Sequence, residues 1–251
     1  MQTVRVEFRL WGEAVAAEVQ RLPERASLDA TLPALRVLDD QAAAIAVRRG
    51  GRPVSCSKGC SACCRIQPVP ITPTEAYAIS LLVEALPEPR RTVIRERFSA
   101  LVRSLQSAGL AELYLEGRKA ASLEEAQANA RKYLDSVLIC PFLEDDACSI
   151  YEQRPFACRE YFVTSPKEFC VNPLLLPVEP VPMMLSGARA SLGTAAAFAG
   201  AAGYVIPLVL ALEYAQAHRE ELEQTHPGDE LLTRSVNMLL ASNPAAQPGC
   251  K

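Results

Sequence analysis

The sequence of 251 residues contains only two histidines and has no excess of positive charge. So little histidine argues against a catalytic zinc site, because such sites are commonly built on histidine ligands. Lys and Arg number 26 against 29 Asp and Glu, which gives a net charge of −3. A dedicated nucleic-acid-binding protein would normally show a basic excess, so we expect no nucleic-acid partner.

Several common signals are also missing. The first ten residues include three charges and no continuous apolar run, so they do not resemble a secretory signal, and we expect a cytoplasmic protein. No catalytic triad, phosphate-binding loop or dinucleotide fingerprint is present. The longest uncharged run, residues 190–212, contains three glycines and a proline. We therefore expect it to form buried helices rather than a membrane span.

Cysteine, by contrast, is abundant, with nine residues in the chain. Disulfides are rare in a reducing compartment, so clustered cysteines there indicate metal binding or redox chemistry. Apolar residues make up 49% of the chain and charged residues 22%, as in an ordinary globular protein.

The patterning predicts a mainly α fold around a small, irregular β and cysteine-rich centre. Thr72-Pro73-Thr74-Glu75 and Ser122-Leu123-Glu124-Glu125 are capping boxes, each of which opens a helix. Alternating apolar residues predict a strand over 3–10, and short strands are expected at 137–139 and 149–151, around an acidic turn at 144–146. The predicted helices span 28–49, 73–86, 90–107, 123–136, 204–224 and 229–241, with an extended proline-rich stretch at 173–182.

We expect one domain over residues 1–251. Its parts would be an N-terminal strand and helix (1–53), a cysteine core (54–172) with a helical insert (73–136), and C-terminal helices (173–251).

The cysteines fall into two groups. The first is dense and consists of Cys56, Cys60, Cys63 and Cys64, and the second is sparse and consists of Cys140, Cys148 and Cys158. The 75 residues from 65 to 139 separate them, so the fold must bring both groups together if they form one site. Residues 56–64 could gather the four thiols of the first group in either of two ways. They could form a helix with the thiols on one face, or a loop that wraps an ion.

Ligation by sulfur alone suits zinc, iron–sulfur clusters or copper(I). A structural zinc site usually has two paired knuckles, which this spacing does not reproduce. The spacing of Cys56, Cys60 and Cys63 is that of the [4Fe–4S] site in radical S-adenosylmethionine enzymes, but the alternating strands and helices of their barrel are missing. Four cysteines hold an ordinary cluster, so seven could hold a cluster with spare thiols or a binuclear centre.

Both motifs resemble the YkgJ-like cysteine-cluster family, which is described as a zinc- or iron-chelating domain. The resemblance rests on Cys56-Ser-Lys-Gly-Cys60-Ser-Ala-Cys63-Cys64, on Cys140-Pro-Phe-Leu, and on Cys148-Ser-Ile-Tyr-Glu-Gln-Arg-Pro-Phe-Ala-Cys158-Arg159. It covers roughly residues 54–162 and implies that all seven cysteines form the metal site. Flagellin lysine methylases carry a similar cluster, so the resemblance also admits protein methylation.

Side chains beside the second group are candidates to support the metal site. Arg154 and Arg159 could donate to thiolates, and Tyr151 could donate to a sulfur. The acidic residues 144–146 are expected to form a solvated turn. Cys170 could be a ligand or a packed thiol, and Cys250 is expected to be an incidental thiol near the chain end.

Two functions remain open from the sequence. One is a metal protein with redox or protein-methylating activity, which would hold an iron–sulfur cluster, [4Fe–4S] above all, or zinc. The other is a non-enzymatic scaffold in which zinc joins the helices and a protein partner binds them. A thiol store for copper or zinc is a third. The sequence leaves open whether the chain is an enzyme and identifies no substrate.

Overall fold

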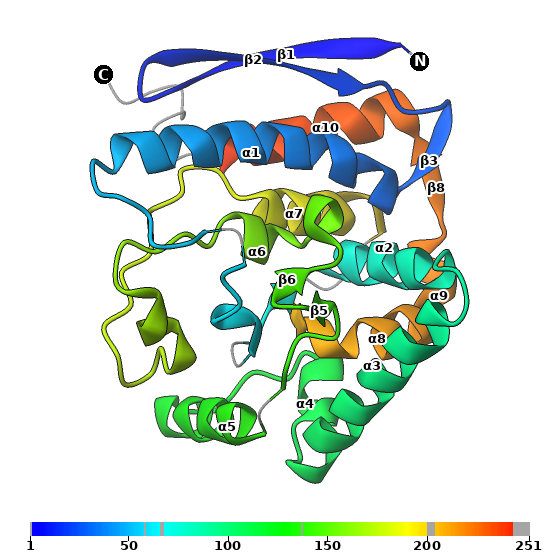
Figure 1. Cartoon of the computed structure of the whole chain (residues 1–251). Coiled ribbons are helices and arrows are strands. Elements are labelled where there is room, and N and C mark those ends of the chain that lie inside the picture. The colour runs from blue at the N-terminus through cyan, green and yellow to red at the C-terminus, as the bar shows by residue number, and fades with distance from the viewer. Residues whose placement is uncertain (1, 58, 66–67, 137, 200–203, 243–251) are drawn as a thin grey trace.

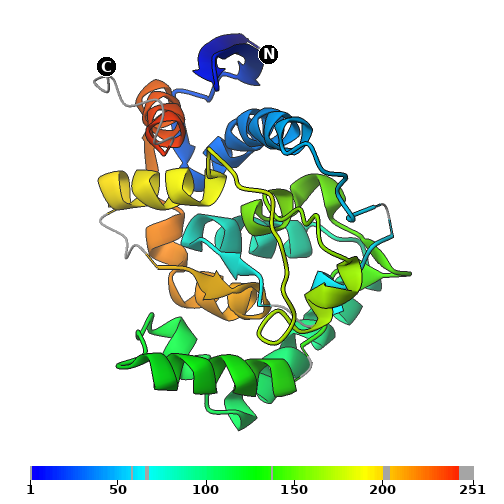
Figure 2. The ribbon, with the colours of Figure 1, turned by 90° about the vertical axis from the view of Figure 1, so that its left-hand side faces the viewer.

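The computed structural model describes residues 2–57, 59–65, 68–136, 138–199 and 204–242. Helices account for 54% of the structure and the strands form only small two-stranded sheets, so the predicted mainly α fold is confirmed. Figure 1 shows the helices stacked in layers beneath one β-hairpin, and Figure 2 shows the same layers from the side.

The hairpin forms the first layer. Its strands β1 (Thr3–Leu10) and β2 (Glu13–Gln20) pair antiparallel through a two-residue turn at Trp11 and Gly12, whose φ values of 48° and 83° are typical of a hairpin turn. Buried β2 side chains, among them Val15 and Val19, pack on α1. The apolar alternation of the sequence predicted β1 but not β2.

Three helices form the layer below the hairpin. They are α1 (Leu32–Arg49), which follows the short 3₁₀ turn η1 (Leu28–Thr31), α7 (Gly187–Ala199) and α10 (Gly228–Ala241). A small sheet of β3 (Arg25–Ser27) and β8 (Thr225–Pro227) joins the chain after the hairpin to the start of α10. The helix predicted over 28–49 is confirmed, apart from its 3₁₀ first turn.

The middle of the molecule is built on α2 (Pro73–Glu84), which packs against α8 (Ala211–Ala217). The predicted capping box is present, since Thr72 Oγ1 accepts the Glu75 N–H and a Glu75 carboxylate oxygen accepts the Thr72 N–H. Ahead of these helices, β4 (Pro70–Ile71) pairs with β7 (Ile206–Pro207). Because residues 206–207 form this strand, the helix predicted over 204–224 begins only after the 3₁₀ turn η5 (Leu208–Leu210). It is divided into two helices, α8 and α9 (Arg219–Leu222).

The predicted insert extends to the lowest part of Figure 1. Besides α2, it contains α3 (Arg90–Ser107), α4 (Ala111–Leu115) and α5 (Leu123–Asp135), which lie lowest, and Ser122 caps α5 as expected. The α3 ring of Phe98 packs edge-to-face on Phe142, with 5.5 Å between ring centroids. This contact anchors the segment after Cys140 to the insert.

The short strands lie elsewhere than predicted. They are β5 (Leu143–Glu144) and β6 (Ala147–Cys148), and the positions expected at 138–139 and 149–151 are not strands. Val137 lies outside the described residues. Asp145 and Asp146 both have positive φ (49° and 56°), so the hairpin closes tightly around them. The Ser149 N–H then donates to Phe142 O at 2.9 Å and ends the ladder.

The 190–212 segment divides between α7, β7, η5 and the start of α8, with residues 200–203 outside the description. Across the described residues, no helix combines the length and apolar character that crossing a bilayer requires.

Candidate metal centre

The first cysteine segment is a loop. Gly59 has φ of 82°, a conformation that glycine adopts without strain, and Cys60 N–H donates to Ser57 O at 2.9 Å. At the end of the described segment, Cys63–Arg65 form a single 3₁₀ turn, η2. Of the two geometries that the spacing allowed, the structure has the loop.

The two cysteine groups lie side by side. Cys140 N–H donates to Cys64 O at 2.7 Å, which joins segments separated by 75 residues of sequence. Next to this bond, Ser61 Oγ donates to Asp146 Oδ1 at 2.9 Å, and the Arg65 guanidinium pairs with the same carboxylate. The acidic turn was expected only to be solvated, but Asp146 holds the first cysteine loop against the second.

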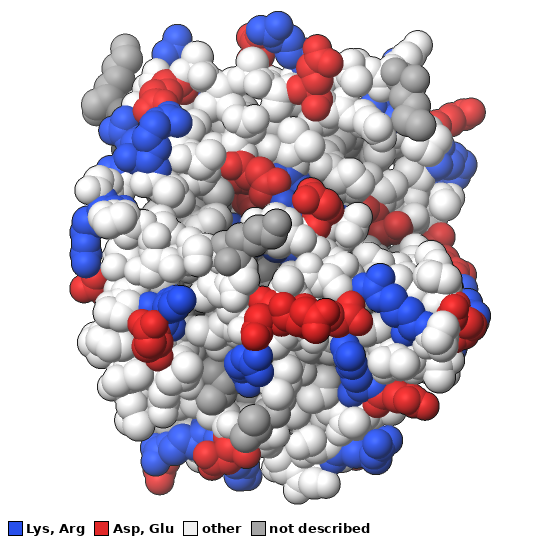
Figure 3. All heavy atoms as spheres, in the orientation of Figure 1, with Lys and Arg blue, Asp and Glu red and all other residues white. Residues whose placement is uncertain are grey.

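Helix α3 supports the same region from the other side. Arg97 Nη1 donates to Pro141 O at 3.0 Å, and Arg90 pairs with Glu144 at 2.9 Å. A hydrogen bond from Ser149 and the nearby Arg90 lower the pKa of Glu144, so this carboxylate stays charged. Figure 3 shows acidic side chains gathered over β5 and β6, with basic side chains beside them.

Cys158 lies on the short helix α6 (Phe156–Arg159), and Glu75 fixes that helix. Glu75 is 1% exposed. Its Oε2 accepts the Thr72 N–H at 2.9 Å, while its Oε1 accepts the Phe156 N–H at 2.7 Å. The capping-box glutamate of α2 therefore also sets the position of α6 and the cysteine it carries.

Eight cysteines lie in the described chain, of which seven are partly buried and Cys170 is buried. Cys63 lies close enough to cysteines of both groups to affect them electrostatically. Charge on Cys63 raises the pKa of thiols in both groups and of Cys170. The 3₁₀ turn η4 (Lys167–Val171), which carries Cys170, packs against η2.

The sequence left open whether Cys170 is a metal ligand or a packed thiol. It lies 12 residues after Cys158, outside both motifs, and no spacing rule connects it to the first group. Its coupling to Cys63, Cys56 and Cys60 places it with them. Cys250 lies outside the described residues.

Burial raises the pKa of Cys140, Cys158 and Cys170, so these thiols are protonated at neutral pH. It raises the pKa of Cys140 to about 12 and that of Cys170 to about 11, and it raises the pKa of Cys158 well above its ordinary value. The largest effect on Cys63 is its hydrogen bond with Cys64, which also raises the pKa. Because thiolates are the ligating form, metal binding at these residues must release protons.

The two arginines of the second motif differ in their contacts. The positive charge of Arg154 lowers the pKa of Cys56 and Cys148, although burial outweighs it at both thiols. Its guanidinium lies 4.2 Å from the ring centroid of Tyr151, which is 56% exposed. Arg159 instead binds Asp40 at 2.6 Å and donates to the Arg154 and Glu152 carbonyls. Its contacts hold the loop before Cys158 against α1.

The donor set suits a thiophilic metal, since eight sulfurs gather in one region. In the part of the chain that the structure describes, however, no three His, Cys, Asp or Glu side chains converge as ligands of one ion. The site therefore fits zinc or iron in the kind of donor, since thiolates are ligands that both metals accept.

Comparison with known proteins gives one match. Residues 55–174 match the sequence profile of the family CxxCxxCC, described as a "putative zinc- or iron-chelating domain". No curated protein matches the chain, and no solved structure does.

Proposed function

We propose that this chain, whose residues 55–174 match the CxxCxxCC family, is a metal-binding protein whose cysteine cluster holds an iron–sulfur cluster. The packing of three cysteine-bearing segments against one another carries the proposal, through the bond from Cys140 N–H to Cys64 O and the contact of η4 with η2. One structural zinc ion needs only four ligands. Eight sulfurs exceed that number, which favours a cluster or a binuclear centre over a single zinc ion.

The ligands we propose are the seven cysteines of the two motifs together with Cys170. When bound, iron would supply electron-transfer or Lewis-acid chemistry. The contribution of the chain is to bring the sulfurs together, release their protons and shield them from solvent. Arg154 would offset thiolate charge beside Cys56 and Cys148, and Tyr151 lies under its guanidinium.

A zinc-dependent scaffold is the second candidate, and one observation favours it. The cysteine segments contact parts of the fold that are distant in sequence, including α1 through Arg159 and Asp40 and α3 through Arg97 and Pro141. An ion held there would fasten these helices together, leaving the outer surfaces for a protein partner.

Metal analysis separates the two. We would purify the full chain without oxygen and measure iron, zinc, acid-labile sulfide and the visible spectrum. Iron with sulfide and visible absorption supports the cluster. A colourless protein with stoichiometric zinc supports the scaffold, and protein without either metal contradicts both.

Variants test the ligand set. Cys63→Ser and Cys170→Ser should each lower metal content, and Cys63→Ser should also lower the melting temperature, because metal binding and folding are coupled. Cys250→Ser is the matched control and should change neither. Unchanged metal content in Cys63→Ser would overturn the assignment of the site. If a cluster is found, its reduction by dithionite and methyl transfer from S-adenosylmethionine would test for redox or methylating activity.

A further inference from the structure

The hairpin presents an open strand edge. In the described part of the chain β1 pairs only with β2, so its other edge is free. The two-residue turn makes Leu10 and Glu13 a hydrogen-bonded pair, and the alternation then turns the even-numbered residues of β1 toward β2. The Arg21 N–H bond to Gln2 O, at 2.9 Å, follows the same alternation. Thr3, Arg5, Glu7 and Arg9 therefore direct their backbone N–H and C=O groups outward.

This edge lacks several of the usual protections, although it carries the charged residues Arg5, Glu7 and Arg9. Strands at sheet edges are commonly short, bulged or interrupted by proline. β1 has eight residues, no proline and an unbroken register with β2. Val4 is 38% exposed, although it belongs to the row that faces α1, and Val6 and Phe8 are only partly buried. The apolar row of Val4, Val6 and Phe8 thus lies on the edge strand, with no further strand beside it in the described part of the chain.

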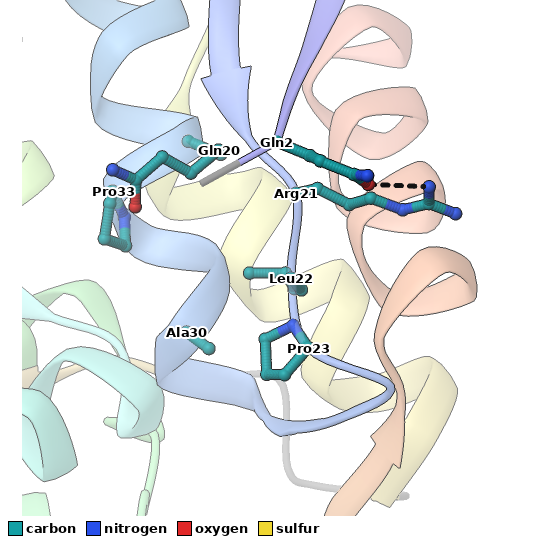
Figure 4. Close-up of a pocket in the computed structure, with 8 residues that line it drawn as sticks. Gln2, Gln20, Arg21, Leu22, Pro23, Ala30 and Pro33 are labelled. Carbon is teal, nitrogen blue, oxygen red and sulfur yellow. Dashed lines mark hydrogen bonds between the residues drawn. The ribbon is translucent and has the colours of Figure 1, made fainter.

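The hairpin is held firmly at its open end. The Arg21 guanidinium reaches Gln2 Oε1 at 3.4 Å, as Figure 4 shows, and it also pairs with Asp229 of α10 at 2.5 Å. These contacts lie beside a hollow of about 520 Å³ between the end of β2 and the start of α1. The edge is therefore fixed on the body of the molecule, as a docking strand should be.

We propose that β1 pairs antiparallel with β1 of a second copy, which forms a four-stranded sheet across a two-fold axis. Charge selects the register. With Val6 opposite Val6 of the second copy, Arg5 faces the other Glu7 and Glu7 faces the other Arg5. A shift of two residues would place Glu7 opposite Glu7 or Arg5 opposite Arg5, and like charges directly opposite are unfavourable.

The same register matches the other face and the neighbouring strand. On the row that faces α1, Val4 lies opposite Phe8 of the second copy, so the exposed valine is covered. On the outer row, Arg5 lies opposite Glu18 in the register of the hairpin, and its guanidinium bonds Glu7 of its own strand at 2.7 Å. In the four-stranded sheet this row would run from Glu18 to Arg5 and then to Glu7 of the second copy, so its charges alternate. Both pairings occur twice, because a two-fold interface uses the same patch on each copy.

Sedimentation velocity and light scattering of the full chain over a range of concentrations test the proposal. We expect a species with twice the 27.2 kDa mass of the chain. Glu7→Arg should raise the dissociation constant about tenfold, because it sets like charges opposite each other at two symmetric positions. The double variant Arg5→Glu with Glu7→Arg should restore association.

Proline variants test which edge is used. Glu7→Pro removes an outward N–H from β1 and should abolish the dimer. Glu18→Pro is the matched control, because its N–H faces the opposite edge of β2, and it should leave the dimer intact. Circular dichroism melts must show both variants folded. A chain that stays monomeric, a dimer that Glu7→Pro leaves unchanged, or a double variant that does not reassociate would each overturn the proposal.

Discussion

Replacing Glu75 with alanine should destabilise the protein and loosen the cysteine centre together. The carboxylate is 1% exposed and accepts two backbone N–H groups, from Thr72 and Phe156. Each buried N–H left without a partner costs about 1–3 kcal/mol. Burial raises the pKa of Glu75 and the charge of the partly buried Arg36 lowers it, and Arg36 would also lose this opposite charge.

The expected loss is about 4 kcal/mol for Glu75→Ala, which lowers the melting temperature by roughly 8–16 °C for a chain of this size. Glu75→Gln keeps the shape but can accept only one of the two N–H bonds, so it should fall between the alanine variant and the wild type. Metal content should drop as well, because the Phe156 amide sets the position of Cys158.

Glu125→Ala provides the matched control. Glu125 belongs to the corresponding capping motif of α5, but its bond to the Ala121 N–H is exposed. Its loss should cost less than about 1 kcal/mol, since water replaces the lost partner. Urea unfolding with a circular dichroism readout measures all three variants. If Glu75→Ala were no more destabilising than Glu125→Ala, the role of Glu75 as a buried link between α2 and α6 would be refuted.

Three further predictions follow from other contacts. Asp146→Ala should weaken zinc binding in a competition assay with a chromophoric chelator, whereas Asp145→Ala should not, because only Asp146 holds Ser61 and Arg65. Burial and the nearby Glu160 raise the pKa of Asp39 from 3.8 to about 8, so the folded state binds the proton more tightly and stability should fall as the pH rises from about 4 to about 8. Asp39→Asn should flatten that dependence in urea titrations at pH 5.5 and 8, and an unchanged slope would count against it. Gly187→Ala should lower the melting temperature more than Gly193→Ala on the same helix, because its Cβ would lie 2.2 Å from the Phe156 ring, whereas at Gly193 the nearest atom is the flexible Met238 sulfur at 3.1 Å.

The helices could be read from the sequence because local chemistry defines their ends. The capping box of α2, the Ser122 cap of α5 and the prolines after Leu86 fix their positions through contacts within a few residues. The short strands could not be placed in this way. Their position depends on the positive φ values of Asp145 and Asp146 and on where the ladder stops, which the apolar pattern does not encode.

The candidate site was predictable where ligands are close in sequence and not where the fold supplies them. The spacing in each motif identified seven cysteines, while Cys170 joins them only through the packing of η4 on η2. The second role of Glu75 was hidden for the same reason, since its capping partner is three residues away and Phe156 is 81 residues away. The strand β2 was missed because its outward residues include alanines, which weaken the alternation.

The bond between Cys140 N–H and Cys64 O also has a consequence for the order of events during synthesis. Translation at about 5–20 residues per second makes the first four thiols roughly 4–15 s before Cys140 emerges. Closing the 75-residue loop between the groups then costs about 4 kcal/mol of chain entropy. Helices α2 to α5 can form within that loop and shorten the distance its ends must search. The first cysteine group therefore lacks its partner thiols until the helical insert has folded and brought the second group beside it.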